Sequence, residues 1–393
     1  MAWGQKQVEI KRKEFIELYQ TGAQTFAALC RQFDISRKNG YKWVKRFAEK
    51  GIAGLKDRNR APATQARATT RTVVNKIVEL RLKFNTWGPK KILGYLRLNH
   101  PHLALPSTTT IGNILDKNGL TVARKYRRRV PPRTEPLAHC QNVNDVWCAD
   151  FKGWFKTENG EKCEPFTLTD ACSRYLIRCV KLDLCNGECV WGVLDAAFRE
   201  YGLPLHLRTD NGPPFATCGP GRLSKLAVKL IKVGVKPDWI DPGNPQQNGR
   251  HERMHLTLKN ETANPPQKTL ELQSIRLHEF QNHYNFVRPH EALGQRTPGS
   301  VYAVSPRVWD GKLRAPEYEE TMEKRKVMKC GCVGWKGNNL FISEVLYKEY
   351  VGLSKQEDGT FQVYYGPLSL GIIDKHNMFH VPQRKTRRVR KRK

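Results

Sequence analysis

Three acidic residues in distinctive local sequences are the best candidates for chemistry in this chain. Asp150 lies in the apolar and aromatic run 145–151, which predicts a buried strand. Asp210 ends a second apolar run and opens the turn-forming sequence Asp-Asn-Gly-Pro-Pro. Glu252 follows Gly249 at the front of a helical stretch. Since the chain carries a net charge of +31, these acidic groups indicate a metal site that acts on a polyanion.

Oxygen ligands of this kind suit Mg²⁺, which binds through one or two carboxylates together with substrate phosphates. A pair of such ions can stabilise both the attacking and the leaving oxygen of an in-line displacement at phosphorus. We therefore expect Asp150, Asp210 and Glu252 to be both catalytic and metal-binding, with two Mg²⁺ ions and with Mn²⁺ as a substitute.

Each carboxylate also has a structural interpretation. Asp210 before Asn-Gly could be a turn former, and Glu252 could be an exposed acid in the first turn of a helix. Asp150 within an apolar run is harder to explain in this way, because a buried carboxylate without a partner is costly. Asp170, in Thr169-Asp170-Ala171-Cys172-Ser173, is not expected to be a ligand.

These residues make the chain resemble insertion-sequence transposases that share a catalytic core with retroviral integrases. Asp150, Asp210 and Glu252 match the family's Asp, Asp and Glu, and Lys259 matches a lysine directed at the DNA end. The resemblance implies cleavage of the ends of a mobile element and joining of the freed 3′-hydroxyl to target DNA. The 41 residues between Asp210 and Glu252 exceed the retroviral spacing, and we place the excess in 216–222.

The pattern around the carboxylates predicts an RNase H-like α/β core over residues 142–300. Three successive strands are expected first, and helices and strands then alternate. The first and fourth strands are neighbours in that fold, so Asp150 and Asp210 should meet, and the helix carrying Glu252 should lie across them. The predicted elements are strands 146–154, 163–170, 175–180, 205–209 and 236–240 and helices 187–201, 224–233, 252 onward and 270–286.

Residues 1–60 have the pattern of a helix-turn-helix domain. Ser36 is expected to cap a third helix that ends at Gly51. This helix should bury Tyr41, Val44 and Phe47, with Trp43 in the core. It should present the following residues to a DNA groove: Arg37, Lys38, Asn39, Lys42, Lys45 and Arg46. A solvated helix face is the alternative for these side chains.

A second helix-turn-helix domain is predicted over residues 71–121. Its helices are expected at 73–84, 89–98 and 108–118, with Ser107 as a cap, and Thr108, Thr109 and Thr110 are candidate DNA contacts. Residues 122–141 form a basic, proline-containing linker. Its candidate phosphate contacts are Arg124, Lys125, Arg127, Arg128 and Arg129. A linker with no binding role is the alternative.

The C-terminal part is strand-like again. Five short strands between residues 317 and 380 predict a small β-barrel. Residues 381–393 are expected to be a disordered basic tail, since the final ten residues include eight Lys or Arg. Removing this tail should weaken DNA binding uniformly across sequences. It should also flatten the salt dependence by roughly 0.9 log-log units for each phosphate that the tail neutralises, which binding measured against salt concentration would test.

Charge is concentrated outside the central region. Residues 1–140 hold 29 Lys and Arg against 9 Asp and Glu, whereas residues 141–316 hold 23 against 19. This favours flanking modules that hold double-stranded DNA, and joining two ends implies at least a dimer on DNA. Without a long apolar run or a secretory signal, a cytoplasmic, DNA-associated protein without a membrane partner is expected. The eleven Cys are expected to be reduced and mostly buried.

Two other functions compete with transposition. A regulator that has lost catalysis would carry the same helix-turn-helix domains, although it would not need three costly acidic positions. His251 to His255 also spells His-Glu-x-x-His, the zinc-protease signature. Its flanks argue against a protease, because the segment follows Gln-Gln-Asn-Gly and does not lie within an apolar helix. We expect His251, His255 and Arg253 to line the helix face near DNA.

Overall fold

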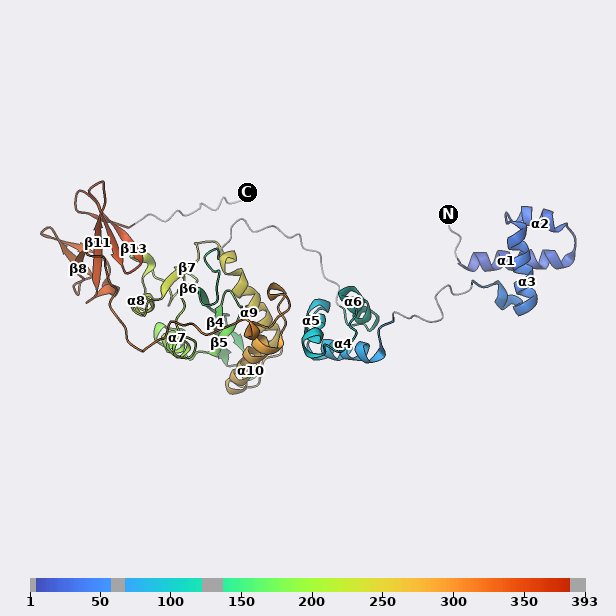
Figure 1. Cartoon of the computed structure of the whole chain (residues 1–393), viewed down its shortest axis with the longest axis horizontal. Helices are drawn as coiled ribbons and strands as arrows, with labels where there is room; N and C mark the ends of the chain where they lie inside the picture. Colours follow the sequence, from blue (N-terminus) through green and yellow to red (C-terminus); the bar gives the residue numbers. More distant parts are fainter. Residues whose placement is uncertain (1–4, 58–67, 122–136, 382–393) are drawn as a thin grey trace. The chain divides into compact units, whose positions relative to one another are not determined.

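A computed structural model of the chain describes residues 5–57, 68–121 and 137–381 (Figure 1). The chain forms two compact units, residues 1–68 and residues 69–393. The predicted contacts Arg124, Lys125, Arg127, Arg128 and Arg129 and nearly all of the basic tail lie outside the described residues. The domain boundaries proposed within the second unit remain predictions.

The first unit contains three helices around a small apolar core. They are α1 (Gln5–Thr21), α2 (Phe26–Gln32) and α3 (Arg37–Lys50), followed by the short helix η1 (Gly51–Leu55). Ser36 caps α3 by accepting a hydrogen bond from the backbone N–H of Asn39, and Gly51 ends it with a positive φ, as predicted. Gly40 lets α3 approach α2, because a Cβ there would lie 2.8 Å from Cys30 Sγ.

The predicted burial of Tyr41 is wrong. Its side chain is 59% exposed and stacks on Phe26 at a centroid distance of 4.1 Å. Trp43 is the buried aromatic residue of α3, and the cations of Arg12, Lys42 and Arg46 lie 3.8 to 5.0 Å from its ring centroid. Helical periodicity was compatible with burial of either Tyr41 or Trp43, and packing against α1 buries Trp43.

A second group of three helices begins the second unit. These are α4 (Arg71–Lys83), α5 (Pro89–Asn99) and α6 (Thr108–Lys117), close to the predicted ranges. Ser107 Oγ accepts a hydrogen bond from the Thr110 backbone N–H and caps α6. The core of this group is apolar and includes fully buried Ile77, Trp87 and Ile111. The group has the helix-turn-helix order that the sequence predicts.

A mixed five-stranded sheet forms the centre of the second unit. Its order is β5-β4-β1-β6-β7, with β1 antiparallel to β4 and parallel to β6. This is the mixed sheet of the predicted RNase H-like fold. The strands are β1 (Val146–Phe151), β4 (Pro165–Asp170), β5 (Leu176–Lys181), β6 (His206–Thr209) and β7 (Lys236–Trp239), and a hairpin of β2 (Phe155–Lys156) and β3 (Lys162–Cys163) extends it.

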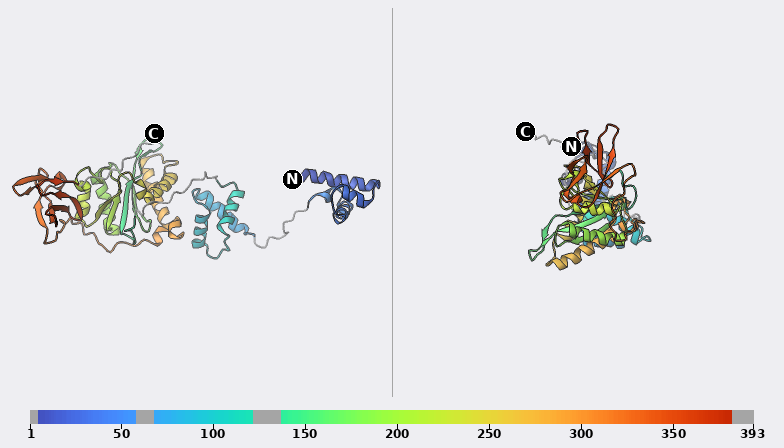
Figure 2. Two further views of the ribbon diagram at one scale, coloured as in Figure 1. Left: turned by 90° about the horizontal axis from the view of Figure 1, so that it is seen from above. Right: turned by 90° about the vertical axis from the view of Figure 1, so that its left-hand side faces the viewer.

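Helices cover both faces of this sheet (Figure 2). The α7 (Gly187–Tyr201) and α8 (Lys225–Lys232) helices bury apolar side chains on the face that carries Trp147 and Phe166. The α9 (Gly249–Thr262) and α10 (Leu270–Asn282) helices pack with buried Leu176 and Cys179 on the other face. The sequence predicted α7 to the residue, whereas α9 begins three residues before Glu252.

The predicted β-barrel at the C-terminal end is not confirmed. The strands β8 (Glu323–Lys326), β11 (Tyr350–Lys355), β12 (Phe361–Tyr365), β13 (Leu368–Ile373) and β14 (Phe379–His380) form an antiparallel sheet, and β9 (Cys332–Trp335) and β10 (Asn338–Phe341) form a separate hairpin. Among the described strands, β8 and β14 are the two edges, so the sheet is open. Turn signals predicted β9 to β13 but missed the edge strands β8 and β14. Closure depends on pairing between distant edges, which local patterns do not encode.

The α8 helix is shared between two apolar cores. Leu226 and Leu230 contribute to the core of the mixed sheet, whereas Val228 and Ile231 pack with the C-terminal strands. Lys232 also pairs with Glu349 at 2.7 Å in a largely buried ion pair. The C-terminal sheet is thus attached to the central fold through both apolar and charged contacts.

Across the described ranges, every helix is too short or too polar to span a bilayer. All eleven cysteines lie within these ranges and are unpaired. Only Cys30, Cys148, Cys163 and Cys179 are buried, so the prediction that most are buried is wrong.

Candidate active site

Asp150 and Asp210 lie at the ends of neighbouring parallel strands. The pairing of β1 with β6 joins Val146 to His206 and Cys148 to Arg208, an offset of 60 residues. Asp210 directly follows β6, and the same offset continued for two residues beyond the paired positions would set the backbone of Asp150 about 4.8 Å from that of Asp210, the spacing of neighbouring strands. Strand pairing, which the sequence predicted only through the expected fold, therefore brings the ends of the two strands together, and the Asp210 charge acts on the Asp150 carboxyl.

The Asp-Asn-Gly sequence holds Asp210 in place. Asp210 Oδ1 accepts a hydrogen bond from the Gly212 backbone N–H at 3.1 Å, and a Cβ on Gly212 would lie 3.2 Å from Asp210 Oδ2. Asn211 donates to the Ile240 carbonyl at 2.8 Å and accepts from Arg222 at 2.6 Å. The end of β6 is thus tied to the residue after β7. Residues 216–222, where the excess length was predicted, lie in the connection to α8.

Glu252 is exposed in the first turn of α9, and its negative charge acts on Asp150. Burial, together with the charges of Asp210 and Glu252, raises the pKa of Asp150 to about 7. Repulsion from the charges of Asp210 and Glu252 thus adds to burial in favouring a proton on Asp150. A divalent cation would relieve this repulsion, so the donor set fits a hard oxygen-seeking ion such as Mg²⁺.

Two buried histidines attach α9 to the sheet. His251 Nε2 and His255 Nε2 each lie 2.7 Å from Thr167 Oγ1, and His251 Nδ1 lies 2.8 Å from Thr169 Oγ1. Thr167 also donates to the Asp150 carbonyl at 3.1 Å. These contacts hold the helix that carries Glu252 on β4, the neighbour of the strand that carries Asp150.

The expectation that His251 and His255 line a DNA-facing surface is wrong. Both are buried, and burial lowers the pKa of His251 far below its ordinary value and that of His255 to about 3. Ligand atoms of Asp150, His251 and His255 do lie within 4.8 Å of one another. Both ring nitrogens of His251 are, however, engaged by threonine hydroxyls, which leaves neither free for Zn²⁺. The zinc-protease pattern thus has a structural explanation here.

The raised pKa of Asp150 predicts a pH-dependent stability in the metal-free protein. The folded carboxyl keeps its proton up to about pH 7, whereas the unfolded one releases it near 3.8. The protonated Asp150 carboxyl therefore contributes stability to the folded state that is fully present below pH 3.8. This contribution is lost as the pH rises through the folded pKa near 7. In EDTA at pH 8, Asp150→Asn should raise the free energy of unfolding by on the order of 2 kcal/mol. Equal urea midpoints for wild type and variant between pH 5 and 8 would contradict this.

The predicted DNA contacts that the structure describes lie mostly at the surface. Arg253 and Lys259 are exposed on α9, and Thr109 is exposed at the start of α6, whereas Thr108 and Thr110 are half-buried. Of the predicted contacts on α3, Arg46 is half-buried, because it lies over Trp43, and the exposed ones are Arg37, Lys38, Asn39, Lys42 and Lys45. Their roles in DNA binding remain predictions.

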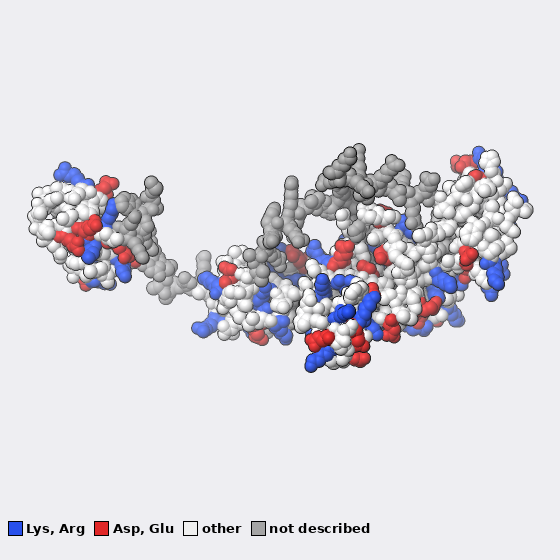
Figure 3. Space-filling view, turned by 180° about the vertical axis from the view of Figure 1, so that it is seen from behind, with Lys and Arg blue, Asp and Glu red and all other residues white. Residues whose placement is uncertain are grey.

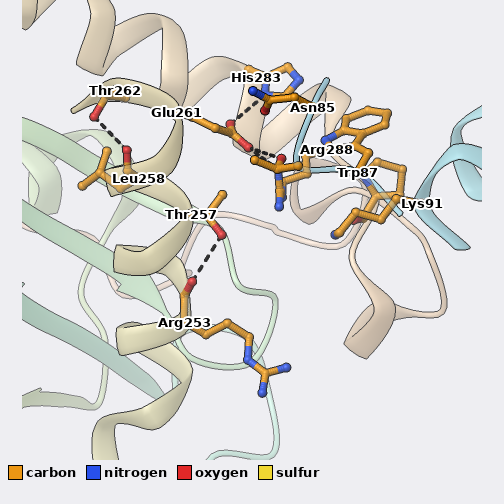
Figure 4. A network of polar contacts seen from close by, with 12 residues as sticks. Asn85, Trp87, Lys91, Arg253, Thr257, Leu258, Glu261, Thr262, His283 and Arg288 are labelled. Atoms are coloured by element: carbon orange, nitrogen blue, oxygen red, sulfur yellow. Dashed lines mark hydrogen bonds and ion pairs between the residues drawn. The ribbon is translucent and has the colours of Figure 1, made fainter. Parts of the chain in front are cut away.

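A polar network joins the second helical group to α9 (Figure 4). Arg288 forms an ion pair with Glu261 of α9, and Thr86 donates to the same Glu261 oxygen at 2.9 Å. His283 Nδ1 lies 3.7 Å from Glu261, and its ring stacks on Phe84 at a centroid distance of 4.9 Å. Sequence reasoning missed this network, because its members are distant in sequence and form no motif.

Charge on the face drawn in Figure 3 is mixed. Lys and Arg side chains there are interspersed with Asp and Glu side chains.

Several known domains and proteins are similar to this chain. Residues 141–245 and 233–298 each match an Integrase core domain, residues 11–63 match a Helix-turn-helix domain, and residues 39–115 match a Homeodomain-like domain. An uncharacterized 39.2 kDa protein of insertion element IS476 from Xanthomonas euvesicatoria is 27% identical over 258 residues, covering 65% of this chain and 69% of that protein. Transposase InsD for insertion element IS2 from Escherichia coli is 28% identical over 229 residues, covering 54% and 72%.

Solved structures are also similar in part. The HTLV-2 integrase catalytic core domain in complex with magnesium has 17% identity and a TM-score of 0.33, covering 42% of this chain and 99% of that one. A simian T-cell lymphotropic virus intasome in complex with the PP2A regulatory subunit B56 gamma has 15% identity and a TM-score of 0.37, covering 73% and 91%.

Proposed function

This chain carries an integrase core and helix-turn-helix domains and is related to insertion-element transposases, and from this premise we propose that it is a DNA transposase. It binds the terminal inverted repeats of a mobile element and cleaves the ends to free a 3′-hydroxyl. It then joins that hydroxyl to target DNA by transesterification. The observation that carries the proposal is the pairing of β1 with β6, which supports a common site for Asp150 and Asp210.

Asp150, Asp210 and Glu252 would hold Mg²⁺, with two ions in the full site. When bound, Mg²⁺ supplies a Lewis acid that activates the attacking oxygen and stabilises charge developing on the phosphate. The chain's own contribution would be positioning, supported by the pairing of β1 with β6 and by the His251 and His255 contacts that hold the helix carrying Glu252. Lys259, exposed on α9 seven residues after Glu252, would contact a phosphate near the cut.

Recognition of the element ends is assigned to the two helix-turn-helix groups. The exposed basic residues of α3 and the start of α6 would contact DNA, and the two groups together would span a longer site than either alone. Joining two ends requires at least two copies of the chain on DNA.

Incubating the full chain with labelled DNA from the ends of its own element, with Mg²⁺ or Mn²⁺, tests the proposal. Metal-dependent cleavage that EDTA abolishes is expected. Binding to end DNA without cleavage under either metal would instead support the alternative, a helix-turn-helix regulator that lacks catalysis. Peptide cleavage with stoichiometric Zn²⁺ would support the protease interpretation.

A further inference from the structure

An exposed tryptophan lies close to Asp150 along the chain. Trp154 directly precedes the β2–β3 hairpin, and its side chain is 59% exposed. The hairpin continues the pairing of β1 with β4, since Lys152 donates to the Pro165 carbonyl at 2.9 Å and Phe155 pairs with Cys163. Trp154 therefore lies in the short connection between β1, the strand that carries Asp150, and β2.

The hairpin that follows Trp154 is firmly held. Cys163 is fully buried among side chains of α9 and α10, and Phe155 packs against the same cluster. The backbone N–H groups of Glu158 and Asn159 donate to the carbonyls of Gln267 and Lys268 at 3.0 and 3.1 Å. Trp154 is thus exposed although the hairpin that follows it is held in place on both of its strands.

One ammonium group lies near this indole, and two further lysines lie close to it along the chain. Lys162 Nζ lies 5.8 Å from the Trp154 ring centroid and 3.1 Å from Glu164, and Lys156 is exposed on the paired strand. The half-buried Lys152 lies near enough to Asp150 for its charge to oppose the raised pKa of that carboxyl. An aromatic face bordered by ammonium groups suits a nucleobase that stacks on the ring while its phosphates meet the lysines.

The chain between Asp150 and Trp154 limits the distance between the indole and the carboxylates. Four residues span at most about 14 Å when fully extended. A DNA strand advances about 3.4 Å per nucleotide, so Trp154 lies within about four nucleotide steps of a phosphate held at the carboxylates. A base that reaches the indole therefore belongs to the DNA at the reaction site.

We propose that Trp154 stacks on an unpaired nucleobase beside the reacting phosphate, with Lys152, Lys156 and Lys162 contacting the adjoining backbone. The assignment rests on the proposed function, since it needs DNA at the carboxylates. The unpaired base comes from one of two sources, the single-stranded overhang of an element end or a distorted base pair in target DNA.

Fluorescence of 2-aminopurine tests the stacking without requiring cleavage. The full chain is titrated, in EDTA, into an element-end duplex with 2-aminopurine in a single-stranded overhang and into an unrelated duplex with 2-aminopurine in an internal bulge. Wild type should quench at least one probe, and the probe that responds identifies the source. Trp154→Ala should lose this quenching and bind that probe roughly 5- to 150-fold more weakly, with affinity for the fully paired duplex unchanged.

Two further variants make the result specific. Trp154→Phe should retain part of the quenching because a ring remains. Phe341→Ala, which removes another exposed ring on the C-terminal hairpin, should behave as wild type. Wild type that quenches neither probe, or equal quenching by Trp154→Ala, overturns the proposal. So does a Trp154→Ala protein that sediments as a smaller oligomer without DNA, because the indole would then bind a second copy. Quenching without any metal-dependent cleavage would overturn only the proposed function.

Discussion

Asp210→Ala should abolish metal-dependent cleavage and joining of end DNA while leaving the affinity for that DNA at the wild-type value. A loss of roughly a thousandfold or more is expected, because metal ions supply several kcal/mol of transition-state stabilisation at such sites. Binding is expected to persist because the helix-turn-helix groups lie outside the site. Cleavage of labelled end DNA and a binding titration in EDTA measure the two properties separately.

The matched control is Asp183→Ala, since Asp183 is a fully exposed aspartate of the same core that pairs only with Lys181 among its described contacts. This control should cleave as wild type does. Asp150→Ala and Glu252→Ala should behave as Asp210→Ala does. Full cleavage activity in Asp210→Ala would remove the proposed mechanism.

Glu261→Gln should destabilise the second unit by about 3 to 5 kcal/mol, the usual effect of removing one partner from a buried ion pair. The Glu261 and Arg288 side chains are 17% and 8% exposed. Burial by itself would raise the pKa of Glu261, yet the His283 hydrogen bond and the Arg288 charge lower it overall. The carboxylate therefore contributes stability above its unfolded pKa, and this contribution is lost as the pH falls through the lower folded pKa.

Urea unfolding at neutral pH, followed by circular dichroism, measures the effect. The control is Glu279→Gln, whose partner Arg276 forms an exposed pair at 3.4 Å and whose removal should change stability by less than about 1 kcal/mol. The double variant Glu261→Gln with Arg288→Met should recover part of the stability, since no charge is then buried alone. A Glu261→Gln protein as stable as the control would show that the ion pair does not hold the second helical group on α9.

Sequence patterns predicted the local elements closely. Helix α7 has the predicted ends, and Ser36 and Ser107 cap the helices expected of them. These predictions hold because periodicity and capping depend on residues only a few positions apart. The open C-terminal sheet and the exposure of Tyr41 were not predicted. Both depend on which part of the chain, distant in sequence, packs against a given face.

The sequence by itself determined the three carboxylates, because Asp150 in an apolar run, Asp210 before Asn-Gly and Glu252 at a helix start are each recognisable from their immediate neighbours. Only the tertiary structure decided that His251 and His255 are buried on Thr167, and that Glu261 meets Arg288 and Thr86. Their partners lie between 27 and 175 residues away in the chain. Contacts over such separations arise from the packing of whole elements, so no short sequence pattern records them.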